Sequence, residues 1–453
     1  MGERSDSAVG SMVQKMVSLQ ADVDIIRGDG RLAADPSCTD VPERGVTSQM
    51  TSFTEALQAS SGECFVDYEA LHAFSVRSYR TFWKFFLSSR YGLAKWSGQS
   101  EPVCIGYDCE HARFFPQVRL NYADNLLDLS VAGASAPALT ACHADGRRVR
   151  WTRGHLRLRV ARLAQAMSEL GIRPGDRVVG VMRNDAEAIT AALAASALGA
   201  TLSTVAPEMG VSAMLERFAP LAPRLLFAHT AAQPFDLGAP LAETIAALTA
   251  GLASLRGVIA LDGDGPSGTT LPPVHRLVEL IDRTDGTDFS WDAFDFNHPL
   301  FIMFSSGTTG MPKCIVHGAG GSLLEHLKEH RLHTDLRPGE KLYFHTSCAW
   351  MMWNWQLSAL ASGVEIVTYD GPLSKIDKLW HLVAEERVAV FGTSPAYLKM
   401  CQDKALKPGS SFDLSALRTI LSTGGPLRSV SRVAPWLELH SLTETWPVAS
   451  APG

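Results

Sequence analysis

The sequence is poor in net charge, in paired cysteines and in long apolar runs, and each absence excludes a class of protein. Its 41 Lys and Arg residues nearly balance 47 Asp and Glu residues, so the net charge of −6 provides no basic field for nucleic acid or an anionic membrane. Eight cysteines are scattered along the chain, and Cys104 and Cys109, which lie close together, have no second pair to complete a metal site. We therefore expect reduced thiols in a cytoplasmic protein.

Two stretches without Asp, Glu, Lys or Arg come nearest to a membrane span, residues 188–207 and 342–364. The first is rich in Ala, Ser and Thr and predicts a buried helix followed by a strand. The second contains His345, Asn354 and Gln356, which are too polar for the core of a bilayer. The N-terminal residues are polar and acidic, so no secretory signal is expected. Neither a membrane nor a nucleic acid is a predicted partner.

The length and the hydrophobic pattern predict a layered α/β protein. A chain of 453 residues, 46% hydrophobic and 19% charged, is long enough for two or three compact units. The predicted order beyond residue 150 is helix 154–170, strand 177–182, a helix from residue 185, strand 200–205, helix 211–218 and strand 224–228. Such alternation predicts a parallel sheet with right-handed crossovers.

The stretch 301–317, FIMFSSGTTGMPKCIVH, carries the clearest chemical signal. Its apolar start predicts a buried strand over 300–304, followed by a loop rich in hydroxyl groups and glycine. Glycine lets the backbone approach a ligand closely, and the hydroxyl and amide groups form a set of donors that suits a polyphosphate. Lys313 adds a mobile positive charge. Met311 and Pro312 separate it from the last glycine, which is not the spacing of the common NTPase loop.

This order of residues resembles the phosphate-binding signature of the acyl-adenylate-forming enzymes, which reads S/T-S/T-G-S/T-T-G-x-P-K. Cys314 stands where those enzymes usually have glycine. The resemblance implies the large N-terminal lobe of the acyl-adenylate-forming fold, with parallel βα-layered subdomains and without the small C-terminal lid domain. It also implies that Lys313 and Thr308 take part in catalysis. The nucleotide phosphates would be bound by Ser305, Ser306, Gly307, Thr308, Thr309, Gly310 and Lys313.

Two further stretches narrow the resemblance to a branch of that family. Residues 114–127, FFPQVRLNYADNLL, are similar to the lead-in of the acetyl-CoA synthetase branch, which activates short-chain acids. Residues 350–355, WMMWNW, are very like the acyl-pocket segment of the subgroup that activates acetoacetate. From the residues alone, such a dense stripe of Trp and Met is more often core than pocket. By resemblance, the acyl group would contact Ala349, Trp350, Met351, Met352 and Trp353.

Two other patterns lie on either side of this segment. After a strand predicted over 417–421, the resemblance implies that Gly424, Gly425 and Pro426 lie against adenine, because glycine lets the backbone approach a flat ring. A helix predicted over 320–332 contains His326 and His330 in an H-x-x-E-H pattern. No separate third ligand is evident, so no metal site is predicted on this helix.

The resemblance extends from about residue 50 to 427, and it divides the chain into four parts. We expect a disordered or frayed N-terminal extension over 1–50, within which the spacing predicts one short helix over 12–26. An acetyl-CoA-synthetase-like segment over 51–130 and an incomplete AMP-binding (adenylation) domain over 131–427 follow. Residues 428–453 are expected to be a divergent tail. In this tail Glu444 lacks the aromatic-Gly pair that precedes the corresponding glutamate of the family.

The activity implied by the resemblance is ligation of an acid to CoA, with ATP cleaved to AMP and pyrophosphate. The expected substrates are acetoacetate, ATP and CoA, with Mg²⁺ bridging the β- and γ-phosphates. Two alternatives remain open at this point: ligation of acetate, propionate or butyrate, and a non-catalytic nucleotide-binding fragment, which the missing lid domain favours. The missing lid would also impair turnover by a ligase. The expected partners are small molecules, and the sequence does not indicate an oligomeric state.

Overall fold

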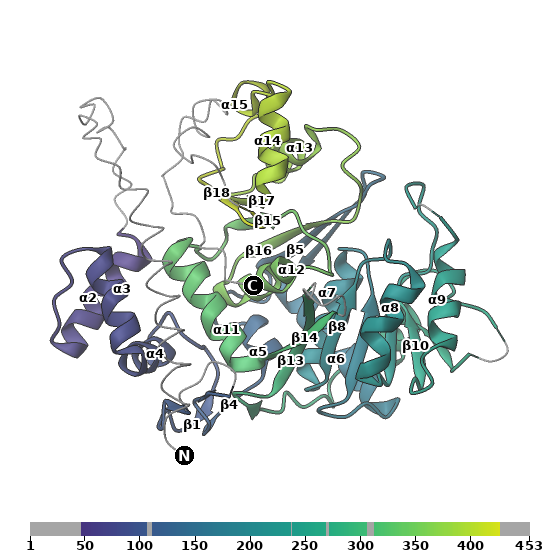
Figure 1. Ribbon diagram of the computed structural model, residues 1–453, viewed down its shortest axis with the longest axis horizontal. Helices are drawn as coiled ribbons and strands as arrows, with labels where there is room; N and C mark the ends of the chain where they lie inside the picture. The colour runs from purple at the N-terminus through teal and green to yellow at the C-terminus, as the bar shows by residue number, and fades with distance from the viewer. Residues whose placement is uncertain (1–46, 107–110, 237, 269–270, 306–311, 426–453) are drawn as a thin grey trace, which may run out of the picture. The chain divides into compact units, whose positions relative to one another are not determined.

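The computed structural model describes residues 47–425, except for 107–110, 237, 269–270 and 306–311 (Figure 1). These residues belong to one of the two compact units of the chain, and the other unit is residues 1–46. The helix predicted over 12–26 and the tail 428–453 lie outside the described residues.

Two largely parallel sheets form the framework. The first has seven strands in the order β11 (Val274–Arg276), β10 (Gly257–Ala260), β9 (Leu225–Ala228), β7 (Arg177–Val181), β8 (Thr201–Val205), β13 (Pro299–Ser305) and β14 (Lys313–Gly318). All neighbouring strands are parallel except the hairpin of β13 and β14, in which Ser305 is paired with Lys313. The carboxyl ends of the parallel strands therefore meet at one edge of the sheet.

The second sheet has the same construction. Its six strands follow the order β18 (Thr419–Ser422), β17 (Val390–Thr393), β15 (Lys341–Phe344), β16 (Glu365–Tyr369), β5 (Pro137–Cys142) and β6 (Arg148–Thr152). Only the hairpin of β5 and β6 is antiparallel. Three short strands form a small additional sheet, β1 (Ser97–Gly98), β4 (Val118–Leu120) and β12 (Phe294–Asp295), and β2 (Cys104–Ile105) pairs with β3 (Arg113–Phe114).

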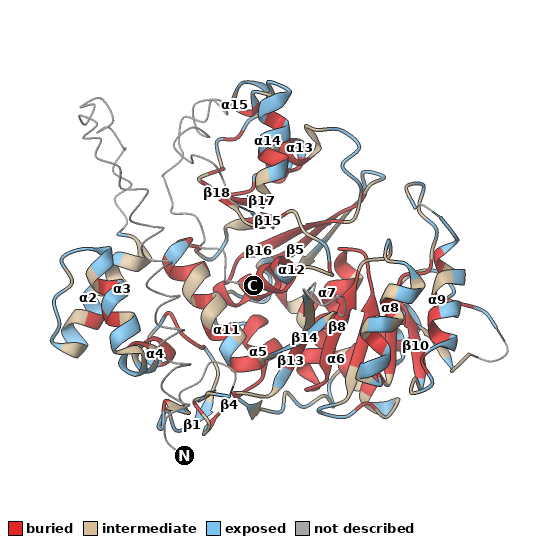
Figure 2. Ribbon diagram, viewed as in Figure 1, coloured by how far each residue is buried: buried red, intermediate tan, exposed pale blue. Residues whose placement is uncertain are grey.

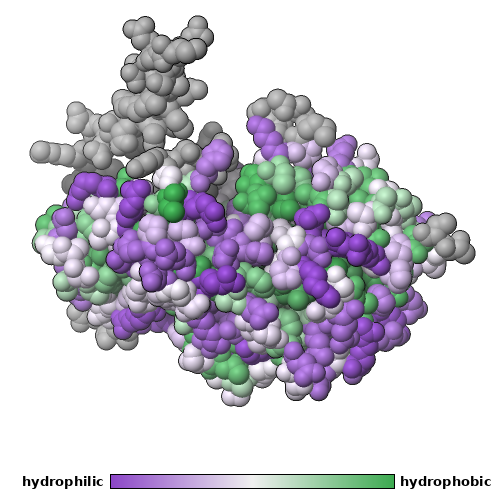
Figure 3. Space-filling view, turned by 90° about the horizontal axis from the view of Figure 1, so that it is seen from below, coloured by the Kyte–Doolittle hydropathy of each residue, from purple (hydrophilic) through white to green (hydrophobic). Residues whose placement is uncertain are grey.

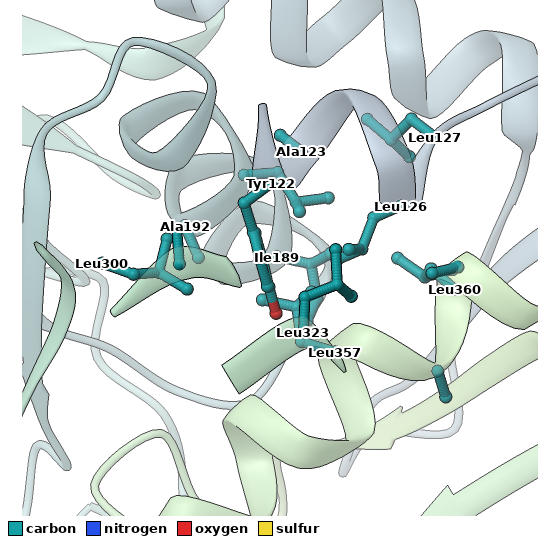
Figure 4. Close-up of a cluster of buried hydrophobic side chains, with 14 of the residues drawn as sticks. Tyr122, Ala123, Leu126, Leu127, Ile189, Ala192, Leu300, Leu323, Leu357 and Leu360 are labelled. Carbon is teal, nitrogen blue, oxygen red and sulfur yellow. The ribbon is translucent and has the colours of Figure 1, made fainter. Parts of the chain in front are cut away.

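A layer of buried helices joins the two sheets. Helix α7 (Ala186–Ala197) contacts β8 of the first sheet and β5 of the second, and all of its residues except Glu187 are buried (Figure 2). Around it lie α5 (Tyr122–Leu126), α6 (Arg153–Glu169), α11 (Ala319–Lys328) and α12 (Met351–Ser358). Figure 4 shows their shared core, where Tyr122, Ile189, Leu323 and Leu357 converge from four different helices. A short π-helix, Glu329–His333, continues α11.

The remaining helices cover the outside of this framework. The N-terminal ones are α2 (Gln49–Ser61), α3 (Tyr68–Arg77) and α4 (Tyr79–Ser88), and Phe53 of α2 contacts Phe82 and Phe86 of α4. The others are α8 (Val211–Phe218), α9 (Leu241–Ala250), α10 (Leu277–Arg283), α13 (Lys378–Glu385), α14 (Pro395–Asp403) and α15 (Pro408–Ser411). Hydrophilic residues cover much of the face in Figure 3, with separate hydrophobic areas between them.

The predicted α/β fold with parallel sheets is confirmed, and the strands predicted over 177–182, 200–205, 224–228 and 300–304 correspond to β7, β8, β9 and β13. The helix predicted over 154–170 is α6, and Gly171, with φ +87°, follows its end. Residues 294 and 295 form β12 because they pair with β4. In the described part of the chain, none of the helices has the length and apolar character needed to cross a membrane.

Candidate active site

A cavity of about 350 Å³ lies where strands of the two sheets end. It is lined by Met182, Arg183, Asn184, Ala206, Pro207, Glu208, His345, Thr346, Ser347, Trp350, Tyr369, Asp370, Gly371 and Ser394. These residues follow β7 and β8 of the first sheet, and β15, β16 and β17 of the second. Ligands of open α/β sheets bind at the carboxyl ends of the strands, so both sheets direct the same kind of edge toward this cavity.

The floor of the cavity is held by a buried hydrogen-bond chain. The backbone amide of Arg183 donates to Nδ1 of His229, at 3.1 Å, and Nε2 of His229 donates to the Asp185 carboxylate, at 2.8 Å. Burial alone would raise the pKa of Asp185, but its interaction with His229 and its bond from the Ala188 amide hold the pKa below the ordinary value. The carboxylate is therefore charged, and it caps α7.

Two polar side chains of the lining are already engaged by the protein. The buried guanidinium of Arg183 forms ion pairs of 2.8 Å with Asp236 and 3.2 Å with Asp262. Asn184 accepts a 2.9 Å hydrogen bond from Nε1 of Trp353 and donates a 3.2 Å bond to the backbone oxygen of Thr346. Since the indole can only donate, the Trp353 bond fixes which end of the Asn184 amide is oxygen.

On the opposite side of the cavity, His345 and Asp370 follow β15 and β16. The Asp370 carboxylate accepts hydrogen bonds from Nδ1 of His143 and from the Ala144 amide. Nδ1 of His345 lies 3.2 Å from the hydroxyl oxygen of Tyr343. Burial lowers the pKa of His345 to about 4, so its ring is neutral at pH 7.

The structure brings the predicted acyl segment and the predicted adenine loop together at one point. A Cβ atom on Gly424, which has φ +95°, would lie 3.3 Å from the indole of Trp350. Trp350 also lines the cavity, whereas Ala349, Met351, Met352 and Trp353 do not. Met351 is 37% exposed, while Met352 and Trp353 are buried in the main core. Gly425 is exposed beside Gly424, and Pro426 lies outside the described residues.

The predicted phosphate loop is described only at its two ends. Ser305 is the last residue of β13 and Lys313 the first of β14; both are exposed and they face each other across the hairpin. Ser306, Gly307, Thr308, Thr309 and Gly310 lie outside the described residues. The same strand contacts the acyl segment, because Nδ2 of Asn354 in α12 lies 3.1 Å from the Met303 sulfur. The segment 350–354 therefore lies beside the cavity, the predicted adenine loop and the strand that leads into the predicted phosphate loop.

The two histidines of the H-x-x-E-H pattern, one in α11 and one in the π-helix that continues it, form polar contacts with α12. Nδ1 of His326 lies 2.8 Å from the Ser358 hydroxyl, and Nε2 of His330 donates to the Trp355 backbone oxygen at 2.9 Å. Burial lowers the pKa of His326 to about 3 and that of His330 well below its ordinary value. Within the described ranges, no group of three His, Cys, Asp or Glu side chains has a geometry that could hold a metal ion.

Sequence reasoning missed most of the residues that line the cavity. Asn184, Glu208, His345, Asp370 and Ser394 were not proposed as site residues, although each lies within three residues of the end of a β-strand. Polar residues directly after apolar runs were a usable signal, because the carboxyl ends of parallel strands share an edge. The signal does not say which strand ends meet.

Comparison with known proteins places this geometry in a family. The AMP-binding enzyme family matches residues 130–452, and the chain belongs to that family. Acetoacetyl-coenzyme A synthetase of Rhizobium meliloti is 38% identical over 396 residues, which cover 85% of this chain and 60% of the relative. Malonamoyl-CoA synthetase vrtB of Penicillium aethiopicum is 34% identical over 410 residues, or 84% of this chain and 56% of the relative.

A solved structure agrees with these relatives. The acetoacetyl-CoA synthetase from Streptomyces lividans is similar with a TM-score of 0.79 and 33% identity, over 86% of this chain and 60% of that structure. The described residues therefore have the fold of the N-terminal lobe of acyl-adenylate-forming enzymes. The chain spans about 60% of the length of these similar proteins.

Proposed function

We propose that this chain is an acetoacetate–CoA ligase. In the first step the acetoacetate carboxylate attacks the α-phosphate of ATP, giving acyl-AMP and pyrophosphate. In the second step the CoA thiol takes the acyl group and AMP leaves. The observation that carries the proposal is the closeness of Gly424 to the indole of Trp350, which lines the cavity, because it brings together the segments proposed to bind the acid and the adenine.

The names of the relatives support a particular kind of acid. Acetoacetate and the malonamoyl group both carry a second carbonyl one methylene away from the reacting carboxyl carbon. The cavity, about 350 Å³ in volume, is large enough for so small an acid. We also propose a cytoplasmic protein whose partners are these small molecules.

The reaction requires two anions, the carboxylate and the triphosphate, to be held together. The carboxylate oxygen must lie opposite the leaving pyrophosphate, in line with the α-phosphorus. Lys313 and the segment 305–310 would bind the β- and γ-phosphates and stabilise the charge that develops on pyrophosphate. Lys313 suits this task because its exposed ammonium is not part of any ion pair in the described residues. Magnesium bound to the phosphates would neutralise further charge, and such an ion needs few protein ligands because the phosphates hold it.

Acetoacetate-dependent exchange between ATP and pyrophosphate tests the first step. The purified chain is expected to catalyse exchange that requires acetoacetate, and Lys313→Ala is expected to lower it at least about 100-fold, the loss seen when a charge-stabilising group is removed. Lys399→Ala, at an exposed lysine of α14, is the matched control and should retain full exchange. Exchange that does not depend on acetoacetate, or that survives Lys313→Ala, would contradict the proposal.

A further inference from the structure

His345 is held firmly at the edge of the cavity. It directly follows β15, and its backbone amide donates a 2.8 Å hydrogen bond to the Gly392 oxygen of the neighbouring strand β17. His345 lines the cavity together with Trp350. The ring can therefore contact a bound acid without a rearrangement of the backbone.

The hydrogen bond from Tyr343 decides which nitrogen of His345 carries the proton. The Tyr343 side chain is completely buried, and burial raises its pKa well above the ordinary value, so the phenol keeps its hydrogen. Within the described part of the chain, Nδ1 of His345 is the one hydrogen-bond partner of this hydroxyl. If Nδ1 carried the proton, the buried O–H would have no acceptor, which is unfavourable for a buried polar group. Nδ1 therefore accepts, and the proton of the neutral ring is on Nε2.

A neutral N–H donor can bind a carbonyl oxygen without adding a positive charge to the pocket. The carboxylate of the acid must remain free to attack phosphorus, and a cation in the pocket would compete for it. The cation of the lining, Arg183, is neutralised by Asp236 and Asp262. No hydrogen bond to Nε2 of His345 is present among the described residues, so this donor is available to a ligand.

From this arrangement we infer that His345 recognises the second carbonyl of the acid, the one at the β position, by donating a hydrogen bond from Nε2. Tyr343 is the positioning residue, because it holds the proton on that nitrogen. The inference rests on the proposed function and adds the group that distinguishes a β-carbonyl acid from a simple fatty acid. Butyrate has the same chain length as acetoacetate but lacks the oxygen, so it would leave the donor without a partner.

The test compares acetoacetate with butyrate in wild type, His345→Phe, His345→Gln and Tyr343→Phe. Wild type should prefer acetoacetate in kcat/KM of ATP–pyrophosphate exchange, and His345→Phe should reduce that preference about tenfold or more, the value of one hydrogen bond to a buried group. His345→Gln keeps an N–H donor and should retain more of the preference. Tyr343→Phe should reduce the preference for acetoacetate by less than His345→Phe does. The matched control, His72→Phe at an exposed position of α3, should leave kcat/KM unchanged for both acids.

Binding of the two acids, followed by tryptophan fluorescence in the presence of a non-hydrolysable ATP analogue, separates this inference from the proposed function. Absence of exchange with every acid would overturn the proposed function. Tighter binding of acetoacetate than butyrate that is lost in His345→Phe would still support the role of His345. Equal loss for both acids in His345→Phe, or equal affinity for both in wild type, would overturn the inference.

Discussion

Helices α7 and α12 are both buried between the sheets, but different forces hold them. Helix α7 consists mainly of alanine, and its eleven buried residues contain only two hydroxyl groups, both bonded within the helix. Helix α12 buries Asn354, Gln356 and Ser358 beside Trp353 and Trp355, and each of these five side chains has a hydrogen bond or a polar contact. Apolar burial thus fixes α7, whereas directional bonds fix α12.

This difference indicates which helix must be held in one fixed orientation. Apolar contact depends on volume and tolerates small rotations of a helix, while a hydrogen bond between buried groups tolerates little. Helix α12 is preceded by Trp350, which lines the cavity and lies close to Gly424. A small rotation of α12 would move this indole, so its register has to be fixed by directional bonds.

The largest expected effect comes from breaking the bonds of α12. Gln356 is fully buried; its side chain accepts from the Phe344 amide of β15 and donates to the Val367 oxygen of β16 at 3.0 Å. Gln356→Leu leaves both backbone groups without a partner, so the free energy of unfolding should fall by about 3–5 kcal/mol. Urea denaturation at pH 7 measures this change. A loss of less than about 1 kcal/mol would contradict the role given to the pair of bonds.

A smaller effect is expected from overfilling α7. Ala192 has no exposed surface and lies in the core shown in Figure 4. Ala192→Leu adds three carbon atoms where no space exists and should lower the free energy of unfolding by about 1–3 kcal/mol. The same denaturation experiment measures it, with Ala192→Gly as the opposite change in volume. If Ala192→Leu stabilised the chain, α7 would not be closely packed.

A third expected effect concerns pH where the π-helix that continues α11 contacts α12. Burial, with the Glu325 carboxylate nearby, raises the pKa of Glu329 to about 7, and Glu329 accepts a 2.6 Å bond from Nε1 of Trp355. Because the folded pKa lies above the unfolded value, the native state binds more protons between about pH 4.5 and 7, and stability is lost as the pH rises through this window.

Glu329→Gln keeps the acceptor for Trp355 and removes the titration. The free energy of unfolding of Glu329→Gln relative to wild type should therefore rise by about 2 kcal/mol between pH 5 and pH 8. The buried histidines titrate in both proteins and cancel in this difference. A difference that does not change with pH would show that Glu329 is charged throughout the range.

Much of the framework could be predicted because it depends on local patterns. The alternation of strands and helices between residues 177 and 228, the helix α7 and the strand before the phosphate loop were all visible as hydrophobic periodicity. Hydrophobic periodicity could not predict which residues of the Trp-rich segment 350–355 line the cavity and which lie in the core. Its hydrophobic residues look alike in sequence, yet Trp350 lines the cavity and Trp353 lies in the core.

The sequence by itself determined the class of fold, the position of the phosphate-binding motif and the resemblance to acyl-adenylate-forming enzymes, because these depend on residue order over short distances. Only the tertiary structure decided that the ends of β7, β8, β15, β16 and β17 meet around one cavity, and that the Tyr343 hydroxyl lies within hydrogen-bond distance of His345. Strand order and burial arise from contacts between distant segments, and they alone determine which polar groups lose water and which keep a free donor.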